Sequence, residues 1–340
     1  MSGAGAFTKE GTGTTTMSGD SSTYTGTTSV TAGTLSVTGT LGNGTNTTAV
    51  NTGGTLSGTG TVYGRVTVAA GGTVHPGNSP GILTWANAPG SSIAGDLQPD
   101  FDGNTAGNGA GFHGQLSGTG TTTIDLNSST LSPFFRGYTI GGVAYNSTFT
   151  PTFGQGFTVV RTDVANGITG AFTAVTPNAA TQTLMNSLAA RFDVAYNANS
   201  IVLYVTPSNY TNVGVTGNQK AVGTTLQAIR PASGTRATDA DSQLVWNSIY
   251  GLNSGGLQVA FDQISGSTMA GAANAAVSTG ALINTSLLGR ANHNRVLAQT
   301  GINDTGVSGG DPTHGWAAWV QPVGKISSVD KDNNGSLLQN

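Results

Sequence analysis

The sequence contains no cysteine and unusually few charged residues. Charged side chains make up 8% of its 340 residues, and aromatic side chains make up 7%. The absence of cysteine excludes disulfides, thiol catalysis and thiolate metal sites within this sequence. Glu10 is the only glutamate, so any pair of carboxylates must come from aspartate. The net charge of -3 provides no basic patch, which argues against a nucleic-acid partner.

Long apolar segments are also missing. No run approaches the ~18–20 apolar residues that a membrane-spanning helix needs. The first residues, Met1 to Gly5, lack the charged and then apolar order of a signal peptide. The sequence starts as if it were inside a repeat, so we expect it to be a fragment of a longer protein.

The polarity of the chain comes from Thr, Ser, Asn and 53 glycines. Such a composition is typical either of disorder or of a β-solenoid, in which short strands alternate with tight corners. Regular placement of Val, Leu and Ile distinguishes the two, because disordered tracts lack it. That regularity is present here, and it favours the solenoid.

A short motif recurs in the first 90 residues. Gly33-Thr34-Leu35 is repeated as Gly54-Thr55-Leu56 and again as Gly72-Thr73-Val74, in steps of 21 and 18 residues. These steps are near the ~20 residues of short solenoid coils. Apolar and polar residues alternate in each copy, which predicts one buried face and one wet face per strand. Leu35, Val37, Val66 and Val68 are then expected inside, with Thr34, Ser36, Thr38 and Thr67 outside.

The stretch from Gly71 to Trp85 combines this motif with two Pro-Gly pairs. Pro76-Gly77 predicts a type II turn, because proline fixes φ at the first central position and glycine accepts positive φ at the second. Pro80-Gly81 predicts the same device again. Because proline is excluded from central sheet ladders, we expect the chain to turn a corner here and continue as a strand.

Residues 91–210 keep the β character but lose the strict period. Strands are predicted at 157–161, 192–196 and 201–205, with a turn at 197–200 between the last two. The last strand is apolar on both faces, as in a covered strand.

From residue 216 the pattern becomes helical. Val222, Leu226 and Ile229 form a stripe that Pro231 ends. A second helix is expected after Asp241 as N-cap, with Leu244, Val245, Ile249 and Tyr250 on its apolar face. A third helix is expected at 257–266, and an Ala-rich fourth at about 267–297.

Several of these features, in this order, resemble bacterial autotransporters of the type V secretion class. Residues 11–35 resemble the strand repeat of their passenger domains, and 72–84 resembles a motif common near the passenger end. Residues 170–175 fit the closing strands of that family, which cap the β-helix and aid its folding. The helical series resembles the segment before the translocator barrel.

The resemblance implies a right-handed parallel β-helix, followed by a helical linker region and an incomplete β segment. We expect β-helix repeats at 1–90, a C-terminal capping region at 91–210, a helical junction at 211–300, and at 301–340 a linker with the first barrel strand. In the family a helix threads the barrel pore, here expected at 281–296. Residues 315–324 resemble the first barrel strand, and the rest of the translocator is missing.

Two motifs suggest catalysis or metal binding, but structural roles explain them better. Asp20-Ser21 resembles part of the nucleophile block of GDSL-type lipases, and Asp311 to His314 has the spacing of the other triad block. We expect these two segments to lie too far apart to cooperate, and the repeat accounts for the first. His75, His113, His293 and His314 have no metal-site spacing, so each is expected to be a surface or stacking histidine.

Asp100 and Asp102 are the best carboxylate pair for a polysaccharide-cleaving enzyme, because residues i and i+2 of a strand share a face. They lie in a loop-like run where aspartate is expected for turn formation. Asn104 continues an alternating set of oxygen ligands, but Thr105 occupies the position that needs glycine in a calcium loop. Asp330 to Gly335 begins the same pattern, and its Asn-Gly favours a hairpin turn.

The sequence therefore predicts a surface-displayed, adhesive passenger segment with no catalytic, cofactor-binding or metal-binding residues. By resemblance, its partners are its own translocator barrel, the outer membrane of a Gram-negative bacterium, and a host or neighbouring cell surface, and it is a monomer. One alternative is a β-helix enzyme that acts on polysaccharides through Asp100 and Asp102. Another is a phage-type fibre, which would be a trimer and would leave the helices unexplained.

Overall fold

The computed structural model describes residues 1–77, 80–126, 128–135, 139–140, 143–144, 149–266, 276–277, 279–285, 287–289, 309–311, 316–318, 328–332 and 335–339. Contacts divide the chain into two compact units, one formed by 1–210 and 225–257 and the other by 211–224 and 258–340. The first unit contains every described strand from β1 to β26.

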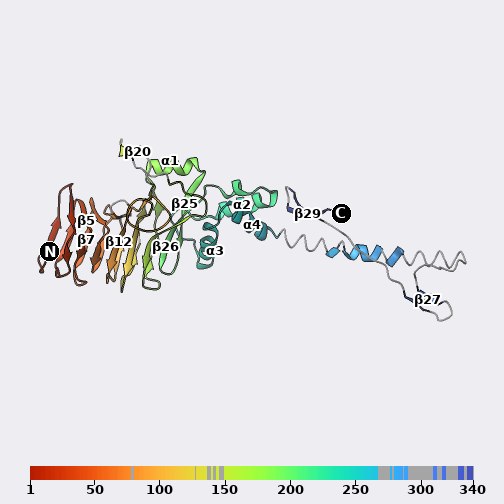
Figure 1. The fold of residues 1–340 in the computed structure, drawn as a ribbon, viewed down its shortest axis with the longest axis horizontal. Coiled ribbons are helices and arrows are strands. Elements are labelled where there is room, and N and C mark those ends of the chain that lie inside the picture. Colours follow the sequence, from red (N-terminus) through yellow and green to blue (C-terminus); the bar gives the residue numbers. More distant parts are fainter. Residues whose placement is uncertain are drawn as a thin grey trace. The chain divides into compact units, whose positions relative to one another are not determined.

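The first unit is built of coils that contribute strands to three sheets (Figure 1). The first sheet contains β1 (Phe7–Lys9), β4 (Thr27–Val30), β7 (Thr47–Val50), β10 (Arg65–Val68), β13 (Ser91–Ile93), β17 (Ile124–Asp125) and β23 (Ile168–Thr169). The second contains β2 (Thr14–Met17), β5 (Gly33–Val37), β8 (Gly54–Gly58), β11 (Thr73–Pro76), β14 (Asp96–Leu97), β18 (Thr130–Leu131) and β24 (Ala174–Val175). The third contains β3 (Asp20–Ser21), β6 (Thr40–Leu41), β9 (Thr61–Tyr63), β12 (Ile82–Ala86), β16 (Gln115–Thr119), β22 (Gly156–Thr162), β26 (Ser200–Pro207) and β25 (Ala190–Tyr196).

Neighbouring coils pair in parallel along all three sheets as far as β22, which confirms the predicted parallel β-helix. The repeat sets the register. Gly33 pairs with Gly54 and Leu35 with Leu56, and Thr55 and Leu56 pair in turn with Thr73 and Val74. The recurring sequence motif is therefore the same structural position in three successive coils.

Apolar side chains line the inside of the coils, as the alternation predicts. Along the second sheet, Leu35, Leu56, Val74, Leu97 and Leu131 form one in-register column, and each is fully buried. Burying each aliphatic side chain of this kind contributes about 1.5–3 kcal/mol. The stack of coils is thus held together by contacts between neighbours along such columns.

The face of the strands that was predicted to be exposed to solvent is only partly exposed. Thr34, Thr38 and Thr67 are partly exposed as expected, but Ser36 and Ser57 are buried, with 3% and 5% of their surface exposed. These two serines pair in register with each other, and each is a small side chain between two neighbouring coils.

The first Pro-Gly pair has the positive φ that the prediction requires at its glycine, and the prediction is wrong at the second pair. Gly77 has φ 97°, as a type II turn requires, and Pro76 is the last residue of β11. Gly81 does not have a positive φ, so Pro80-Gly81 does not form a second type II turn. A Cβ at Gly81 would lie 2.6 Å from the Cα atom of Gly77, so glycine is needed there for close approach. Asn78 and Ser79 lie outside the described residues.

The end of the coil stack is closed by an antiparallel hairpin. β25 and β26 pair with each other, and β26 pairs with β22, which confirms the strands and turn predicted at 192–205. Ile201, Leu203 and Val205 are fully buried, whereas Val202 and Tyr204 are partly exposed. Two further short strands, β15 (Asp100–Phe101) and β19 (Phe134–Phe135), pair in parallel, and β20 (Thr139–Ile140) pairs with β21 (Val143–Ala144).

Helix α1 (Ala179–Ser187) was not expected from the sequence. Its N-cap is Asn178, whose side chain accepts a hydrogen bond from the Thr181 N–H at 2.8 Å. Thr181 in turn accepts from the backbone N–H of Phe135, and it is fully buried. The helix buries only Thr181, Leu184 and Met185, so it carries a weak apolar stripe.

Helix α2 (Gly217–Ile229) is present as predicted, but its buried stripe is rotated. Ile229 is 65% exposed, while Gln219, Leu226 and Arg230 are buried. The prediction failed because the buried stripe begins and ends on polar residues that hydrogen bonds satisfy inside the protein. Gln219 donates to Asp262 at 3.0 Å, within the second unit.

Helix α3 (Ala240–Tyr250) begins after Asp239, which replaces the predicted N-cap Asp241. Leu244 and Val245 were expected in the core but are 64% and 52% exposed. The buried face contains Gln243, Trp246, Ile249 and Tyr250. Trp246 stacks on both Tyr210 and Tyr250, and this aromatic packing sets the rotation of the helix.

Helix α4 (Ser254–Ser265) covers most of the third predicted helix. In the range predicted for the fourth, residues 276–277, 279–285 and 287–289 are helical. Further strands are β27 (Gly309–Asp311), β28 (Trp316–Ala318), β29 (Ser328–Asp332) and β30 (Gly335–Gln339). β29 and β30 pair antiparallel, with Asp332 opposite Gly335, and Asn333 and Asn334 of the predicted turn lie outside the described residues. The other residues of the predicted barrel strand at 315–324 lie outside the described residues.

None of the helices in the described part of the chain has the length and hydropathy needed to cross a membrane.

Candidate functional site

Asp100 is buried and lies within hydrogen-bonding distance of His75, a contact that was not predicted. Asp100 lies in β15 with 3% of its surface exposed, and its Oδ2 atom is 3.1 Å from Nε2 of His75. β15 ends at Phe101, so no strand extends to Asp102 to align the two carboxylates on one face. The strand alignment that would place both carboxylates on one face is therefore absent.

His113 is a core histidine. Its ring stacks on Phe101 with 5.8 Å between centroids and meets the edge of Phe157 at 5.5 Å. Burial lowers the pKa of His113, although hydrogen bonds to backbone carbonyls oppose the shift. A neutral ring can donate from Nε2 to the Thr158 carbonyl oxygen, 3.2 Å away. The prediction of a stacking histidine is confirmed here.

The remaining candidates do not form a site among the described residues. Asp20, the first residue of β3, accepts a hydrogen bond from the Ser22 N–H at 2.8 Å, which lowers the pKa of its carboxyl. His293 and His314 lie outside the described residues. Within the part of the chain that the structure describes, no group of three His, Asp or Glu residues could hold a metal ion.

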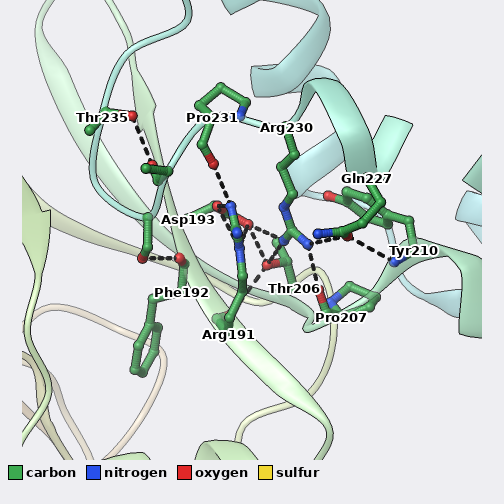
Figure 2. A network of polar contacts seen from close by, with 12 residues as sticks. Arg191, Phe192, Asp193, Thr206, Pro207, Tyr210, Gln227, Arg230, Pro231 and Thr235 are labelled. Atoms are coloured by element: carbon green, nitrogen blue, oxygen red, sulfur yellow. Dashed lines mark hydrogen bonds and ion pairs between the residues drawn. The ribbon is translucent and has the colours of Figure 1, made fainter. Parts of the chain in front are cut away.

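The most elaborate polar cluster lies instead at the edge of the closing hairpin, around Asp193 (Figure 2). Its carboxylate is 1% exposed, on edge strand β25. Arg191 donates from Nε to both carboxylate oxygens at 3.1 and 3.3 Å. Thr206 on β26 donates its hydroxyl at 2.6 Å, and the guanidinium of Arg230 donates to the same oxygen.

Arg230 reaches this cluster from the residue after helix α2. It also donates to the carbonyl oxygen of Pro207 at 2.7 Å and to the Gln227 side chain at 3.3 Å. Its guanidinium carbon lies 4.2 Å from the ring centre of Tyr210, an arrangement that adds a cation–π contact. A buried charge needs such compensation, because desolvation would otherwise cost several kcal/mol.

The segment that follows Arg230 covers the free edge of β25. We call residues 230–236 the strap. Ser233 donates its hydroxyl to the Phe192 carbonyl oxygen at 2.5 Å, and Arg191 donates to the Pro231 carbonyl oxygen at 2.7 Å. Tyr196 donates its hydroxyl to the Gly234 carbonyl oxygen.

Helix α3 contributes to the same edge. Asn247 donates to the Tyr196 carbonyl oxygen at 3.1 Å. An uncovered edge strand presents unpaired backbone groups that template aggregation. Ser233 and Asn247 occupy two of these groups, the carbonyl oxygens of Phe192 and Tyr196, at the edge where the third sheet ends. Its geometry suits a structural role, because its charged groups are bonded to one another and the side chains of Asp193 and Arg230 are shielded from solvent.

Sequence reasoning missed this site. Two signals for it were present: an aspartate inside the apolar strand Phe192-Asp193-Val194, and an arginine at the end of a helix in a chain with few charges. Charged residues at such positions are almost never buried without a partner.

Comparison with known proteins agrees with the fold. Residues 7–37 match the model of the passenger-associated transport repeat. A segment of 78 residues, 23% of the chain, is 41% identical to the BmaC autotransporter adhesin of Brucella suis biovar 1 (strain 1330). The chain spans about 2% of the length of that relative. These matches confirm the predicted resemblance to an autotransporter passenger and indicate display at the outer membrane and cell surface.

Proposed function

We propose that this segment, which carries the repeat and the coil architecture of an autotransporter passenger, serves adhesion at the bacterial surface. The observation that carries the proposal is the in-register stack of parallel coils, which presents rows of threonine side chains on its outer faces, such as Thr14, Thr34 and Thr55, and Thr27 and Thr47. The adhesin relative supports it. Many weak contacts repeated along such faces add up through multivalency.

Under this proposal the remaining parts of the chain serve export and anchoring. The capping region at 91–210 closes the β-helix, and the helices of 211–300 form the junction toward a C-terminal translocator. Residues 301–340 would lead into that translocator, which would hold the protein in the outer membrane. Support comes from the order of the elements, since coils, closing hairpin and helices follow one another as the resemblance implies.

The proposal is tested by displaying the chain on a non-adherent Gram-negative strain, fused to a translocator of known function. Protease accessibility on intact cells measures display, and settling of cells and attachment to coated surfaces measure adhesion. We expect displayed cells to aggregate or attach more than cells that display an unrelated passenger of similar size. Equal attachment at equal display would refute the adhesive role and leave the passenger architecture unaffected.

A further inference from the structure

The outer face of the β-helix carries a hollow at one corner between the first and second sheets. Its volume is about 250 Å³, and it is lined by Gly71, Gly72, Thr73, Ala94, Gly95, Asp96, Ser128 and Thr130. Pockets for drug-sized ligands are larger, ~300–1,000 Å³. The hollow therefore fits a ligand group of the size of one small ring.

A difference in corner length produces the hollow. Only residues 94–95 connect β13 to β14, whereas residues 69–72 and 126–129 connect the corresponding strands of the coils on either side. The short corner belongs to the coil between the two coils that have longer corners. It is fixed there, because the Asp96 N–H donates to the Gly72 carbonyl oxygen and the Thr130 N–H donates to that of Gly95. A Cβ at Gly95 would lie 2.0 Å from the Gly72 oxygen, so glycine is required at the floor.

Asp96 is oriented at the side of this hollow by two hydroxyl groups. Thr130 and Ser132 donate to its Oδ1 atom at 2.8 and 2.7 Å. No hydrogen bond to its Oδ2 atom is present among the described residues, so this oxygen can accept from a ligand. The lining contains no Lys or Arg to neutralise the carboxylate.

A row of hydroxyl groups continues from the hollow along the second sheet. Thr14, Thr34, Thr55 and Thr73 pair in register, and Asp96 and Thr130 continue the row on the next two coils. The spacing between neighbouring strands is ~4.8 Å. Each hydroxyl group of the row can donate and accept hydrogen bonds, so the row can contact a ligand that extends beyond the hollow.

From this geometry we propose that the hollow binds one sugar residue of a neutral glycan, with Asp96 accepting from a sugar hydroxyl and the threonine row contacting the adjoining residues. Anionic polymers are disfavoured by the unneutralised carboxylate. The lining has no aromatic side chain for a sugar to stack on, so each contact is weak. This inference rests on the proposed adhesive function and gives it a ligand class.

Affinity electrophoresis of the purified chain in gels containing mannan, galactan or dextran tests the inference. We expect at least one of these neutral polysaccharides to retard the chain, and polygalacturonate not to. Asp96→Asn should weaken retardation about tenfold, and Ala94→Trp, which fills the hollow, should abolish it. Asp241→Asn, which makes the same charge change on helix α3, should leave it unchanged. Circular dichroism and the melting temperature confirm that each variant is folded.

Several outcomes would overturn the inference. These are no retardation by any neutral polysaccharide, equal retardation of the folded Ala94→Trp variant, or loss of retardation in EDTA, which would assign the hollow to a divalent cation. Its failure is distinguishable from that of the proposed function. If cells that display the wild-type and the Ala94→Trp chains adhere equally, the glycan site is refuted and the adhesive role is not. If the purified chain is retarded in the gels but cells that display it do not attach, the adhesive role is refuted and the glycan site is not.

Discussion

Arg230 donates a hydrogen bond to the carboxylate of Asp193, 37 residues earlier in the chain, and both side chains are almost completely buried. The bond joins the end of helix α2 to the edge strand of the third sheet. It makes the strap and the closing hairpin interdependent, because the buried guanidinium of Arg230 has Asp193 as its counter-charge and the carboxylate of Asp193 is shared between Arg230 and Arg191.

Replacing Arg230 by methionine should lower the free energy of unfolding by about 3 kcal/mol, since it removes one of the two arginine partners of the buried Asp193 carboxylate. Arg191 still contacts Asp193, which keeps the loss at the lower end of the usual range. Urea unfolding followed by circular dichroism measures the effect. The matched control is Arg161→Met, because the Arg161–Asp163 pair is 49% and 45% exposed. Exposed pairs contribute less than about 1 kcal/mol. Equal losses for the two variants would contradict a stabilising role for the buried cluster.

Leu56→Ala should cost about 2–5 kcal/mol, because Leu56 is fully buried in the aliphatic column of the second sheet. Leu244→Ala removes the same atoms from a side chain that is 64% exposed, and it should change stability by less than about 0.5 kcal/mol. The same urea experiment compares the two. A large loss of stability for Leu244→Ala would mean that helix α3 buries the face that the hydrophobic pattern predicts.

The coils were predictable from the sequence because their information is local and repeated. The Gly-Thr-Leu motif fixes its own register, and period-two alternation fixes which side chains enter the core. The helices were predictable in position but not in rotation. The pattern placed Ile229, Leu244 and Val245 inside, and all three are exposed.

What fixes the rotation is a set of long-range polar and aromatic contacts. Arg230 donates a hydrogen bond to Asp193, and Trp246 stacks on both Tyr210 and Tyr250. No local pattern encodes these partners. The Asp96 hollow escaped prediction for a related reason, since it arises from the difference between three corner lengths in separate coils.

Helix α3 offers a test of the corrected N-cap. Asp239 accepts from the backbone N–H of Ser242 at 2.8 Å, and this bond lowers the pKa of its carboxyl. Asp239→Ala should therefore lower the melting temperature and the helical signal more than Asp241→Ala does. Because the folded pKa is the lower one, the stabilisation by Asp239 is present above the unfolded pKa of about 4 and is lost as pH falls through the folded pKa. Identical behaviour of the two variants would contradict the assignment.

Asp96 should give the opposite dependence for stability. Burial raises the pKa of Asp96 above 3.8, although hydrogen bonds from Ser132 and Thr130 oppose the shift. The folded state then binds more protons, so the contribution of Asp96 to stability falls as pH rises from 3.8 through the raised pKa. Retention by a neutral polysaccharide, which uses the ionised form, should instead increase over the same window. Asp96→Asn should remove both dependences, as urea unfolding and affinity electrophoresis between pH 3 and 7 can measure. A retention profile that is flat in the wild type would contradict the role of the carboxylate.

The Pro76-Gly77 corner can be dissected with two glycines that share a backbone conformation. Gly77 and Gly44 have φ values of 97° and 104°, so alanine at either position is strained by about 1–2 kcal/mol. Only Gly77 is also crowded, since a Cβ there would lie 2.0 Å from the backbone nitrogen of Gly81, whereas a Cβ at Gly44 meets no atom within 4 Å. Gly77→Ala should therefore cost more than Gly44→Ala, and the difference measures the close approach that closes the corner. Equal losses in urea unfolding would mean that φ alone selects glycine at this position.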